Sequence, residues 1–233
     1  IEREVLLNAA PHIVWPMRFV LPHSPEQRPA WLVRLGLFLC DHLGGRRKLA
    51  GCRNIDLTRD PEGAPIRDEF RRAFEYSDCW VDDARLVISN LKSARQMGAR
   101  IFARHRCVAA RRSENGKLWN IELSAPDGAP VKLQARGLVN ATGPWVKRFL
   151  DEQTHIKTGK RVRLIKGSHI VVPRLYDGDH AFILQNSDQR IVFIIPYERS
   201  FSVIGTPDIP APEGEKPVCT QEEIDYLCGI ASY

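Results

Sequence analysis

The chain of 233 residues has no uncharged apolar run of about 18 residues, so we expect no membrane-spanning helix. We also expect no signal peptide, because the opening segment IEREVLLNAAP carries charge from its second residue. Internal repeats and low-complexity tracts are absent too. With 43% hydrophobic and 27% charged residues, the chain has enough apolar material for one large globular core or two small ones.

Cysteine is present but scattered. The six cysteines stand singly, without the CxxC pairs of a zinc site or the density of a disulfide scaffold. We therefore expect no metal and a reducing, cytoplasmic compartment. Zinc-finger spacing and the aromatic signature of ribonucleoprotein domains are also missing, so no nucleic-acid partner is expected. The net charge of +6 still allows an anionic substrate or an anionic membrane surface.

The first part of the chain is expected to contain two helices around a short strand. Residues 2–10 have a helical pattern, and PMRFVLP has the composition of a strand. Apolar residues recur at helical spacing between residues 28 and 43, before the pair Gly44–Gly45, which is a typical helix end. The polar stretch 51–65 is expected to be a surface loop.

The predicted helix 28–43 allows two interpretations. Trp31 and Phe38 stand beside Arg34 and the basic run 46–48, so this helix could rest on an anionic membrane surface. Burial of the same apolar residues in a core is the other interpretation. The sequence alone does not choose between them.

A helix and a set of short strands are expected in the middle of the chain. The helix is capped by Asp82 or Asp83 and stops at Gly98. A strand at 100–104 follows, and then a hairpin whose tight turn contains Asn115–Gly116.

One more strand of this β-meander is expected in LQARGLVNATG, which runs through Leu138 and Val139 into a small-residue exit and a helix from about Trp145. Four later segments, bounded by Pro, Gly or Asp, predict an antiparallel sheet: 161–173, 180–185, 190–197 and 201–210. The predicted fold class is α+β, with segments of two domains interleaved along the chain.

NATGPW, from Asn140 to Trp145, has the features of a ligand-binding turn. Alanine and glycine at a strand end let the backbone approach a cofactor closely, and the following helix N-terminus favours negative charge. A tight turn with a purely structural role is the alternative.

KGSH combines a cation and a base with two small residues. In a strand, Lys166 and Ser168 share one face, while Gly167 and His169 share the other. His169 could act as a general base near neutral pH, or Lys166 could bind a phosphate. A solvated lysine at a strand edge is the simpler alternative.

Four strings occur in an order that resembles the aerobic, flavin-linked glycerol-3-phosphate dehydrogenases: YSDCWVDDARLV, GLVNATGPWV, RLIKGSHIVVP and IGTPD. The opening EREVLLNAAPHIVWPMRF resembles the same family, so the similarity covers nearly the whole chain. The resemblance implies FAD as cofactor and an α/β FAD-binding half-domain interleaved with an antiparallel substrate, or cap, domain. The implied segments are 1–75 for the cap, 76–150 for the FAD-binding domain and 151–233 for the cap again.

The resemblance also implies contacts with FAD. Val108 occupies the strand position whose backbone meets the adenine, and Ala141, Thr142 and Gly143 form the turn near the adenosine and pyrophosphate. Trp145 is expected to pack over the same region. Simple core packing is the alternative for Val108 and Trp145.

Substrate contacts are implied in the second half. Lys166 and Thr206 are the expected substrate-binding residues, and His169 is the expected catalytic base. The string GTPD resembles a GTTD string of the family, so Pro207 replaces one hydroxyl-bearing residue.

The GxGxxG loop of such flavoenzymes is missing, since HLGGRRKLAG follows a helix and has different spacing. We therefore expect an internal segment that is inactive alone. For the parent protein, the resemblance implies oxidation of sn-glycerol 3-phosphate to dihydroxyacetone phosphate by hydride transfer to FAD, with electrons passing to quinone.

The same resemblance implies a peripheral location on the inner face of the cell membrane, and it allows a homodimer of the full-length protein. Two other functions remain open. One is an oxygen-dependent glycerol-3-phosphate oxidase. The other is a non-enzymatic basic module that binds a membrane surface or RNA.

Overall fold

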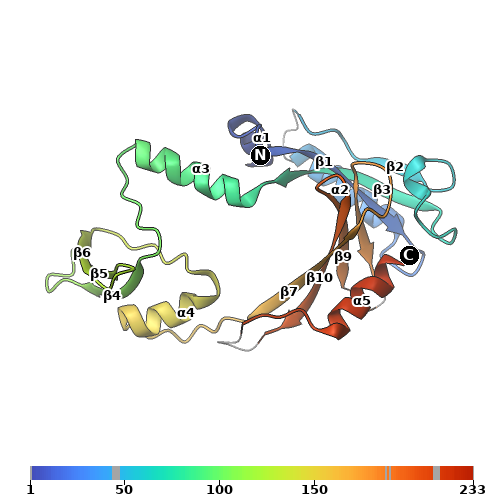
Figure 1. The fold of residues 1–233 in the computed structure, drawn as a ribbon. Coiled ribbons are helices and arrows are strands. Elements are labelled where there is room, and N and C mark those ends of the chain that lie inside the picture. The colour runs from blue at the N-terminus through green and yellow to red at the C-terminus, as the bar shows by residue number, and fades with distance from the viewer. Residues whose placement is uncertain (1, 44–47, 187, 189, 212–215, 233) are drawn as a thin grey trace. The chain divides into compact units, whose positions relative to one another are not determined.

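The computed structural model describes residues 2–43, 48–186, 188, 190–211 and 216–232. The chain divides into two compact units. The first, which we call the sheet unit, combines Ile1–Ser89 with Ile165–Tyr233, and the second, the meander unit, is Asn90–Leu164. Figure 1 shows the elements of each unit. The assignment of residues 76–150 to an FAD-binding segment stays a prediction.

The sheet unit is built on seven strands in the order β2-β3-β1-β8-β9-β10-β7. All neighbours are antiparallel except β1 and β8, which are parallel. The predicted antiparallel arrangement of the four later segments is confirmed. The strands are β1 (Val14–His23), β2 (Arg53–Asp56), β3 (Arg72–Val81), β7 (Ile165–Pro173), β8 (Ala181–Gln185), β9 (Ile191–Tyr197) and β10 (Phe201–Pro210).

The two faces of this sheet differ because side chains alternate along each strand. One face, which we call the covered face, carries Val20, Phe182, Ile194 and Ile204, and these pack with Leu227 and Ile230 of helix α5 (Gln221–Ala231). The opposite face, which we call the open face, carries the apolar residues Met17, Phe19, Ala181, Ile183 and Phe193. The main core of the unit therefore lies between the covered face and α5.

Helix α1 (Glu2–Ala9) and helix α2 (Ala30–Leu43) confirm the two helices predicted near the start. The predicted stop at Gly44–Gly45 lies outside the described residues. The apolar side of α2 is not buried, since Trp31 and Phe38 are 68% and 52% exposed. Core burial, one of the two interpretations of this helix, is therefore wrong within the sheet unit.

The prediction of a surface loop at 51–65 is wrong. The segment contains β2 and a short 3-10 helix, η1 (Pro61–Gly63), and Ile55 is buried against the covered face. The polar composition of this segment favoured a loop over a strand. One of its charged side chains, Arg53 of β2, is however paired with Glu75, which lies in a distant segment of the chain.

The meander unit contains the expected three-stranded hairpin meander, β4 (Arg106–Arg112), β5 (Trp119–Ser124) and β6 (Pro130–Ala135). Helix α3 (Asp83–Gln96) leads into it. The Asp82 carboxylate accepts the Arg85 N–H at 3.0 Å, and Gly98 has a φ of +95°, so both predicted ends of this helix are confirmed.

Two strand predictions in the meander unit differ from the structure. The strand predicted at residues 100–104 is wrong, since these residues belong to no described strand and end in a turn at residues 103–104, where Arg104 has a φ of +58°. The third strand of the meander is shorter than predicted, because β6 ends at Ala135 and leaves Leu138 and Val139 outside it. A helical run does follow, as η2 (Gly143–Trp145), α4 (Val146–Arg148) and the π-helical η3 (Phe149–Thr154).

A buried carboxylate joins three strands at the β2 edge of the sheet. Glu75 of β3 is 4% exposed and accepts hydrogen bonds from Arg18 of β1, at 2.5 Å, and from Arg53 of β2. Burial alone would raise the pKa of Glu75, but the two guanidinium groups outweigh it and hold the pKa below its usual range. Arg53 also binds Glu62 at 2.8 Å, which fastens η1 to the strand.

Substitution Glu75→Gln is expected to lower the free energy of unfolding by about 2–3 kcal/mol, because two guanidinium groups lose their shared buried carboxylate. Urea denaturation measures this loss. The control Glu26→Gln changes an exposed loop carboxylate and is expected to shift stability by less than about 0.5 kcal/mol. Equal effects of the two substitutions would show that the buried network contributes nothing.

Candidate functional site

Two glycines on neighbouring strands make room for His169 and Thr206, two of the three residues expected on the substrate side. His169 of β7 pairs with Gly205 of β10, and a methyl group on Gly205 would lie 2.4 Å from His169 Cδ2. A methyl group on Gly167 would lie 2.2 Å from Thr206 Oγ1. Each glycine thus leaves the space that the side chain of the other strand occupies. The structure brings His169 and Thr206 together on the β7–β10 pair.

A bulge sets the position of Thr206. The pairing register shifts between Gly205 and Asp208, so Thr206 and Pro207 together oppose a single residue of β7. Pro207, which stands where the resembling GTTD string has a threonine, is fully buried and packed. Thr206 Oγ1 is buried and has no hydrogen-bond partner among the described residues. A ligand hydroxyl or phosphate oxygen would supply the missing partner.

Lys166 and Ser168 lie on the covered face and bind one carboxylate of α5. Glu223 accepts hydrogen bonds from Lys166 Nζ and from Ser168 Oγ, both at 2.7 Å. Burial would raise the pKa of Glu223, but the hydrogen bonds from Lys166, the Thr220 backbone and Ser168 lower it to about 2. The predicted sharing of one face by Lys166 and Ser168 is confirmed. A phosphate contact from Lys166 stays a prediction, and the phosphate would have to compete with this carboxylate.

The backbone of Val108 stands outside the regular pairing of the meander. Cys107 pairs with Leu123 and Ala109 with Glu122, so Val108 has no partner on β5. Its side chain is 40% exposed. A bulged residue of this kind leaves backbone groups available to a ligand, which fits the contact with adenine that the sequence predicts. Core packing, the alternative for Val108, does not fit this exposure.

The NATGPW turn is organised by its first residue, Asn140. Asn140 donates from Nδ2 to the Val146 carbonyl at 2.9 Å and accepts the Thr142 hydroxyl at 2.7 Å. Gly143 has a φ of +57°, a conformation that favours glycine, and nothing lies within 4 Å of where its Cβ would be. The frequent use of asparagine in local turns was the only sequence signal for this role.

The turn is open to a large ligand. Ala141 and Gly143 are exposed, Trp145 is 62% exposed, and Thr142 is half-buried. β4 packs against η3, the continuation of the helical run that starts at Gly143. The meander unit therefore holds the five predicted FAD residues, and the sheet unit holds His169, Lys166 and Thr206.

The residues of the meander unit fit the expected cofactor. They offer an irregular strand and an exposed small-residue turn with open space, which suit a nucleotide and its pyrophosphate. For the substrate, the sheet unit offers an unpartnered buried hydroxyl beside a glycine. Among the described residues, no group of three or more His, Cys, Asp or Glu could hold a metal ion.

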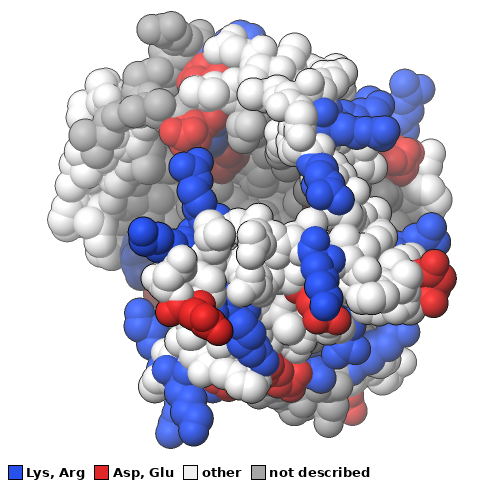
Figure 2. Space-filling view, turned by 90° about the vertical axis from the view of Figure 1, so that its left-hand side faces the viewer, with Lys and Arg blue, Asp and Glu red and all other residues white. Residues whose placement is uncertain are grey.

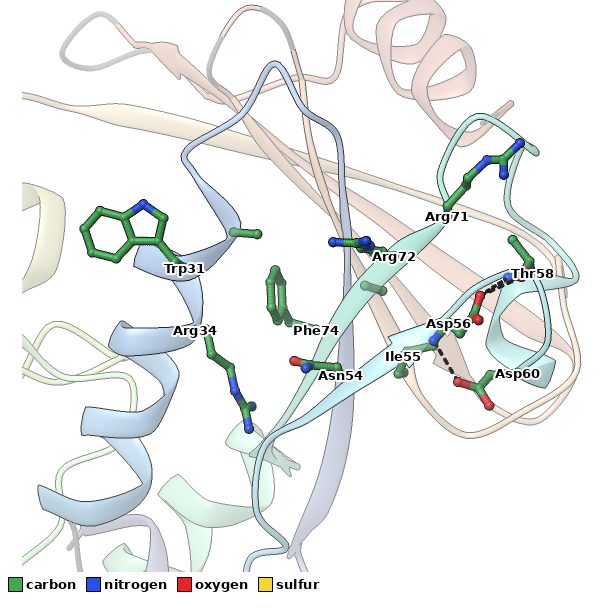
Figure 3. Close-up of a pocket in the computed structure, with 12 residues that line it drawn as sticks. Trp31, Arg34, Asn54, Ile55, Asp56, Thr58, Asp60, Arg71, Arg72 and Phe74 are labelled. Atoms are coloured by element: carbon green, nitrogen blue, oxygen red, sulfur yellow. Dashed lines mark hydrogen bonds between the residues drawn. The ribbon is translucent and has the colours of Figure 1, made fainter.

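A separate pocket of about 690 Å³ lies between α2 and the strands β2 and β3. Figure 3 shows Arg72 and Phe74 projecting from β3 toward α2, which carries Trp31 and Arg34. Because β2 and β7 are the two edges of the sheet, this pocket lies across the full width of the sheet from His169. None of the predicted site residues lines it.

Basic side chains do not form one continuous surface on the face that Figure 2 draws. Lys and Arg are spread over it, and several lie against Asp or Glu. Ion pairs at 2.6 Å (Lys147 with Asp151) and 2.9 Å (Arg148 with Glu152) are examples from the meander unit. The net charge of the sequence therefore overstates the attraction of this face for polyanions.

Substitution Gly205→Ala is expected to displace the His169 ring and to cost about 1–3 kcal/mol of stability. The new methyl group would also lie 2.8 Å from the Ser168 carbonyl oxygen, which is backbone and cannot move cheaply. Gly167→Ala is the matched control, because it meets only the Thr206 side chain, which can rotate. Thermal unfolding and the NMR signals of the His169 ring measure both effects. A Gly167→Ala variant as unstable as Gly205→Ala would contradict this reading of the site.

Comparison with known proteins gives the chain its family. Residues 2–233 match the family model described as FAD dependent oxidoreductase. The chain is 56% identical over 230 residues to D-erythritol 1-phosphate dehydrogenase of Brucella abortus, with 97% of this chain and 45% of that protein covered. It is 53% identical over 233 residues to glycerol-3-phosphate dehydrogenase of Pseudomonas aeruginosa, with 99% and 44% covered.

A solved structure has the same fold. The glycerol-3-phosphate dehydrogenase from Bacillus halodurans, complexed with FAD, matches with a TM-score of 0.77 at 24% identity, over 100% of this chain and 42% of that one. The chain thus spans less than half the length of the relatives it matches. The resemblance to flavin-linked glycerol-3-phosphate dehydrogenases and the α+β fold class are both confirmed. The chain belongs to the FAD-dependent oxidoreductase family.

Proposed function

We propose that this chain forms the substrate-facing sheet and part of the FAD-binding surface of an enzyme that oxidises a small polyol phosphate to its ketone. The substrate that we propose first is sn-glycerol 3-phosphate, which would give dihydroxyacetone phosphate. D-erythritol 1-phosphate is the second candidate, because a relative 56% identical to the chain carries that name. The observation that carries the proposal is the placement of His169 and the unpartnered Thr206 hydroxyl over opposing glycines.

The roles of the residues follow from their chemistry. FAD, when bound, supplies a hydride acceptor. His169 takes the proton of the substrate hydroxyl, so that the hydrogen on the same carbon can leave as hydride with the C–H bonding electrons while the oxygen forms a carbonyl. Thr206 Oγ1 hydrogen-bonds the substrate and orients it for His169. The Val108 backbone and the turn of Ala141, Thr142 and Gly143 contact the adenosine and pyrophosphate.

A non-enzymatic binding module, the alternative from another functional class, is disfavoured by the family match over residues 2–233. The electron acceptor rests on resemblance alone. We propose quinone, with oxygen as the alternative, and a test for peroxide during turnover distinguishes them. A homodimer of the longer protein stays an expectation.

Flavin reduction tests the function. A protein of the relatives' length that contains this chain is expected to retain FAD, and sn-glycerol 3-phosphate or D-erythritol 1-phosphate is expected to bleach its absorbance. The chain alone is expected to bind FAD weakly, because no GxGxxG loop is present in its sequence. Failure of both substrates to bleach a flavin-loaded protein would reject the proposed function.

The role of His169 is tested separately. In the flavin-loaded protein, His169→Asn is expected to slow the bleaching by about 100-fold or more while FAD stays bound, because the general base is lost. Stopped-flow absorbance measures the rate. The control His23→Asn changes a histidine on β1, and its rate is expected to stay at the wild-type value. Bleaching by His169→Asn at the wild-type rate would assign the base to another residue.

We also propose that α2 contacts an anionic membrane surface. Among the described residues, no helix has the length and hydropathy to cross a bilayer. α2 instead exposes a run of apolar side chains, and Arg34 beside them lines the pocket shared with Arg72. Such a face, apolar with flanking arginines, suits the boundary between headgroups and acyl chains. The exposed apolar residues of α2 are Trp31, Leu32, Leu35, Phe38 and Leu39.

The double substitution Trp31→Ser with Phe38→Ser is expected to weaken binding to vesicles that contain phosphatidylglycerol by about tenfold or more, because two aromatic rings no longer leave water. Vesicle sedimentation measures the binding. The control Val218→Ser changes an apolar side chain that is 65% exposed outside α2, and it is expected to have no effect. Wild-type protein that stays in the supernatant would reject the membrane contact.

A further inference from the structure

Glu223 caps helix α5 and also binds two side chains of strand β7. Its carboxylate accepts the Thr220 N–H at 2.7 Å, and Thr220 Oγ1 accepts the Glu223 N–H at 3.4 Å, which is the capping box that starts α5. The same carboxylate also binds Lys166 Nζ and Ser168 Oγ of β7. Glu223 is 3% exposed, so these contacts form in a nearly dry environment. The start of α5 is thereby fixed to β7.

Lys166 and Ser168 flank Gly167, and His169 follows directly. Because side chains alternate in a strand, a clamp on Lys166 and Ser168 fixes the backbone that carries Gly167 and His169 on the opposite face. Lys166 Nζ has a second partner, the Val218 carbonyl, at 2.7 Å. The contacts of Lys166 and Ser168 on the covered face therefore help to fix the position of the His169 ring relative to Gly205 on the open face.

Other contacts already hold α5 to the sheet. Leu227 and Ile230 are buried in the core of the covered face. The Tyr226 hydroxyl donates to Asp188 at 3.0 Å, and the Arg190 guanidinium lies 3.9 Å from the centre of the Tyr226 ring. A buried ion pair adds little net stability compared with apolar packing, and its best-attested role is to select one arrangement. The Glu223 clamp is thus placed to fix geometry more than to attach the helix.

We propose that Glu223 is a positioning residue for the substrate site: it holds segment 166–169 of β7 so that His169 and Thr206 keep their places over Gly205 and Gly167. This inference rests on the proposed function for its catalytic consequence. It does not depend on that function for its structural consequence. The two consequences are measured separately.

Hydrogen exchange tests the structural consequence on the chain as it stands. In Glu223→Gln the strand amides of 165–169 are expected to exchange about tenfold faster, because charge-assisted bonds to β7 are lost. Exchange in β3 and β8 is expected to stay at the wild-type rate. The matched control is Glu222→Gln, an exposed neighbour on the first turn of α5, which is expected to leave β7 unchanged. A uniform rise across the sheet unit, or no rise at β7, would overturn the proposal.

Ser168→Ala provides a second variant that retains the Lys166–Glu223 pair. It is expected to give a smaller rise at the same amides, and it carries the test if Glu223→Gln does not fold. An unchanged rate at 165–169 in that case would overturn the proposal.

Kinetics test the catalytic consequence in the flavin-loaded protein of the relatives' length. Glu223→Gln is expected to lower kcat about 10- to 100-fold, because a displaced base reacts poorly, while KM changes less than about twofold. A rise in KM with unchanged kcat would overturn the positioning role. If wild-type protein is not reduced by either polyol phosphate, the proposed function fails, and the exchange result still decides whether Glu223 holds β7.

Discussion

The alternation of side chains along β7 is the constraint on which the candidate site depends. Successive residues of a strand point to opposite faces, so one short segment serves two purposes. Lys166 and Ser168 bind the buried carboxylate of Glu223, while Gly167 and His169 face the other way. A shift of one residue in the register with β10 would exchange these roles and place an ammonium group on the open face. The ion pair and the glycine contacts therefore select the same register independently.

The close approach of β7 and β10 explains why glycine stands at positions 167 and 205. At Gly205 a side chain would collide with the His169 ring and with the Ser168 backbone, whereas at Gly167 it would meet only Thr206. The bulge between Gly205 and Asp208 then leaves the Thr206 hydroxyl buried but without a partner among the described residues. An unpaired buried hydroxyl costs free energy, and a bound substrate would recover it. The same geometry that packs the strand pair thus leaves one buried hydroxyl unsatisfied.

Local signals predicted the elements whose causes are local. Asp82 and Gly98 marked the ends of α3, and Asn115–Gly116 marked the hairpin, because caps and tight turns depend on neighbouring residues. Strand β2 was missed because only Ile55 of its four residues is buried, in a core supplied by distant segments. Residues 100–104 have strand composition, but a strand also needs an edge to pair with. The clamp by Glu223 was equally invisible, since 55 residues separate it from Ser168.

The availability of charged side chains also depends on contacts between distant segments. The net charge of +6 allowed several anionic partners, but many of the cations are engaged within the structure. Arg18 and Arg53 share Glu75, and Lys166 binds Glu223, so these groups fix strands and are not available as a general basic surface. Arg34 and Arg72 line an open pocket beside exposed apolar residues of α2, and Asp56 and Asp60 line the same pocket and offset part of their charge. Selectivity for an anion in this protein therefore depends on which individual cations lack an acidic partner, because paired cations contribute little to long-range attraction.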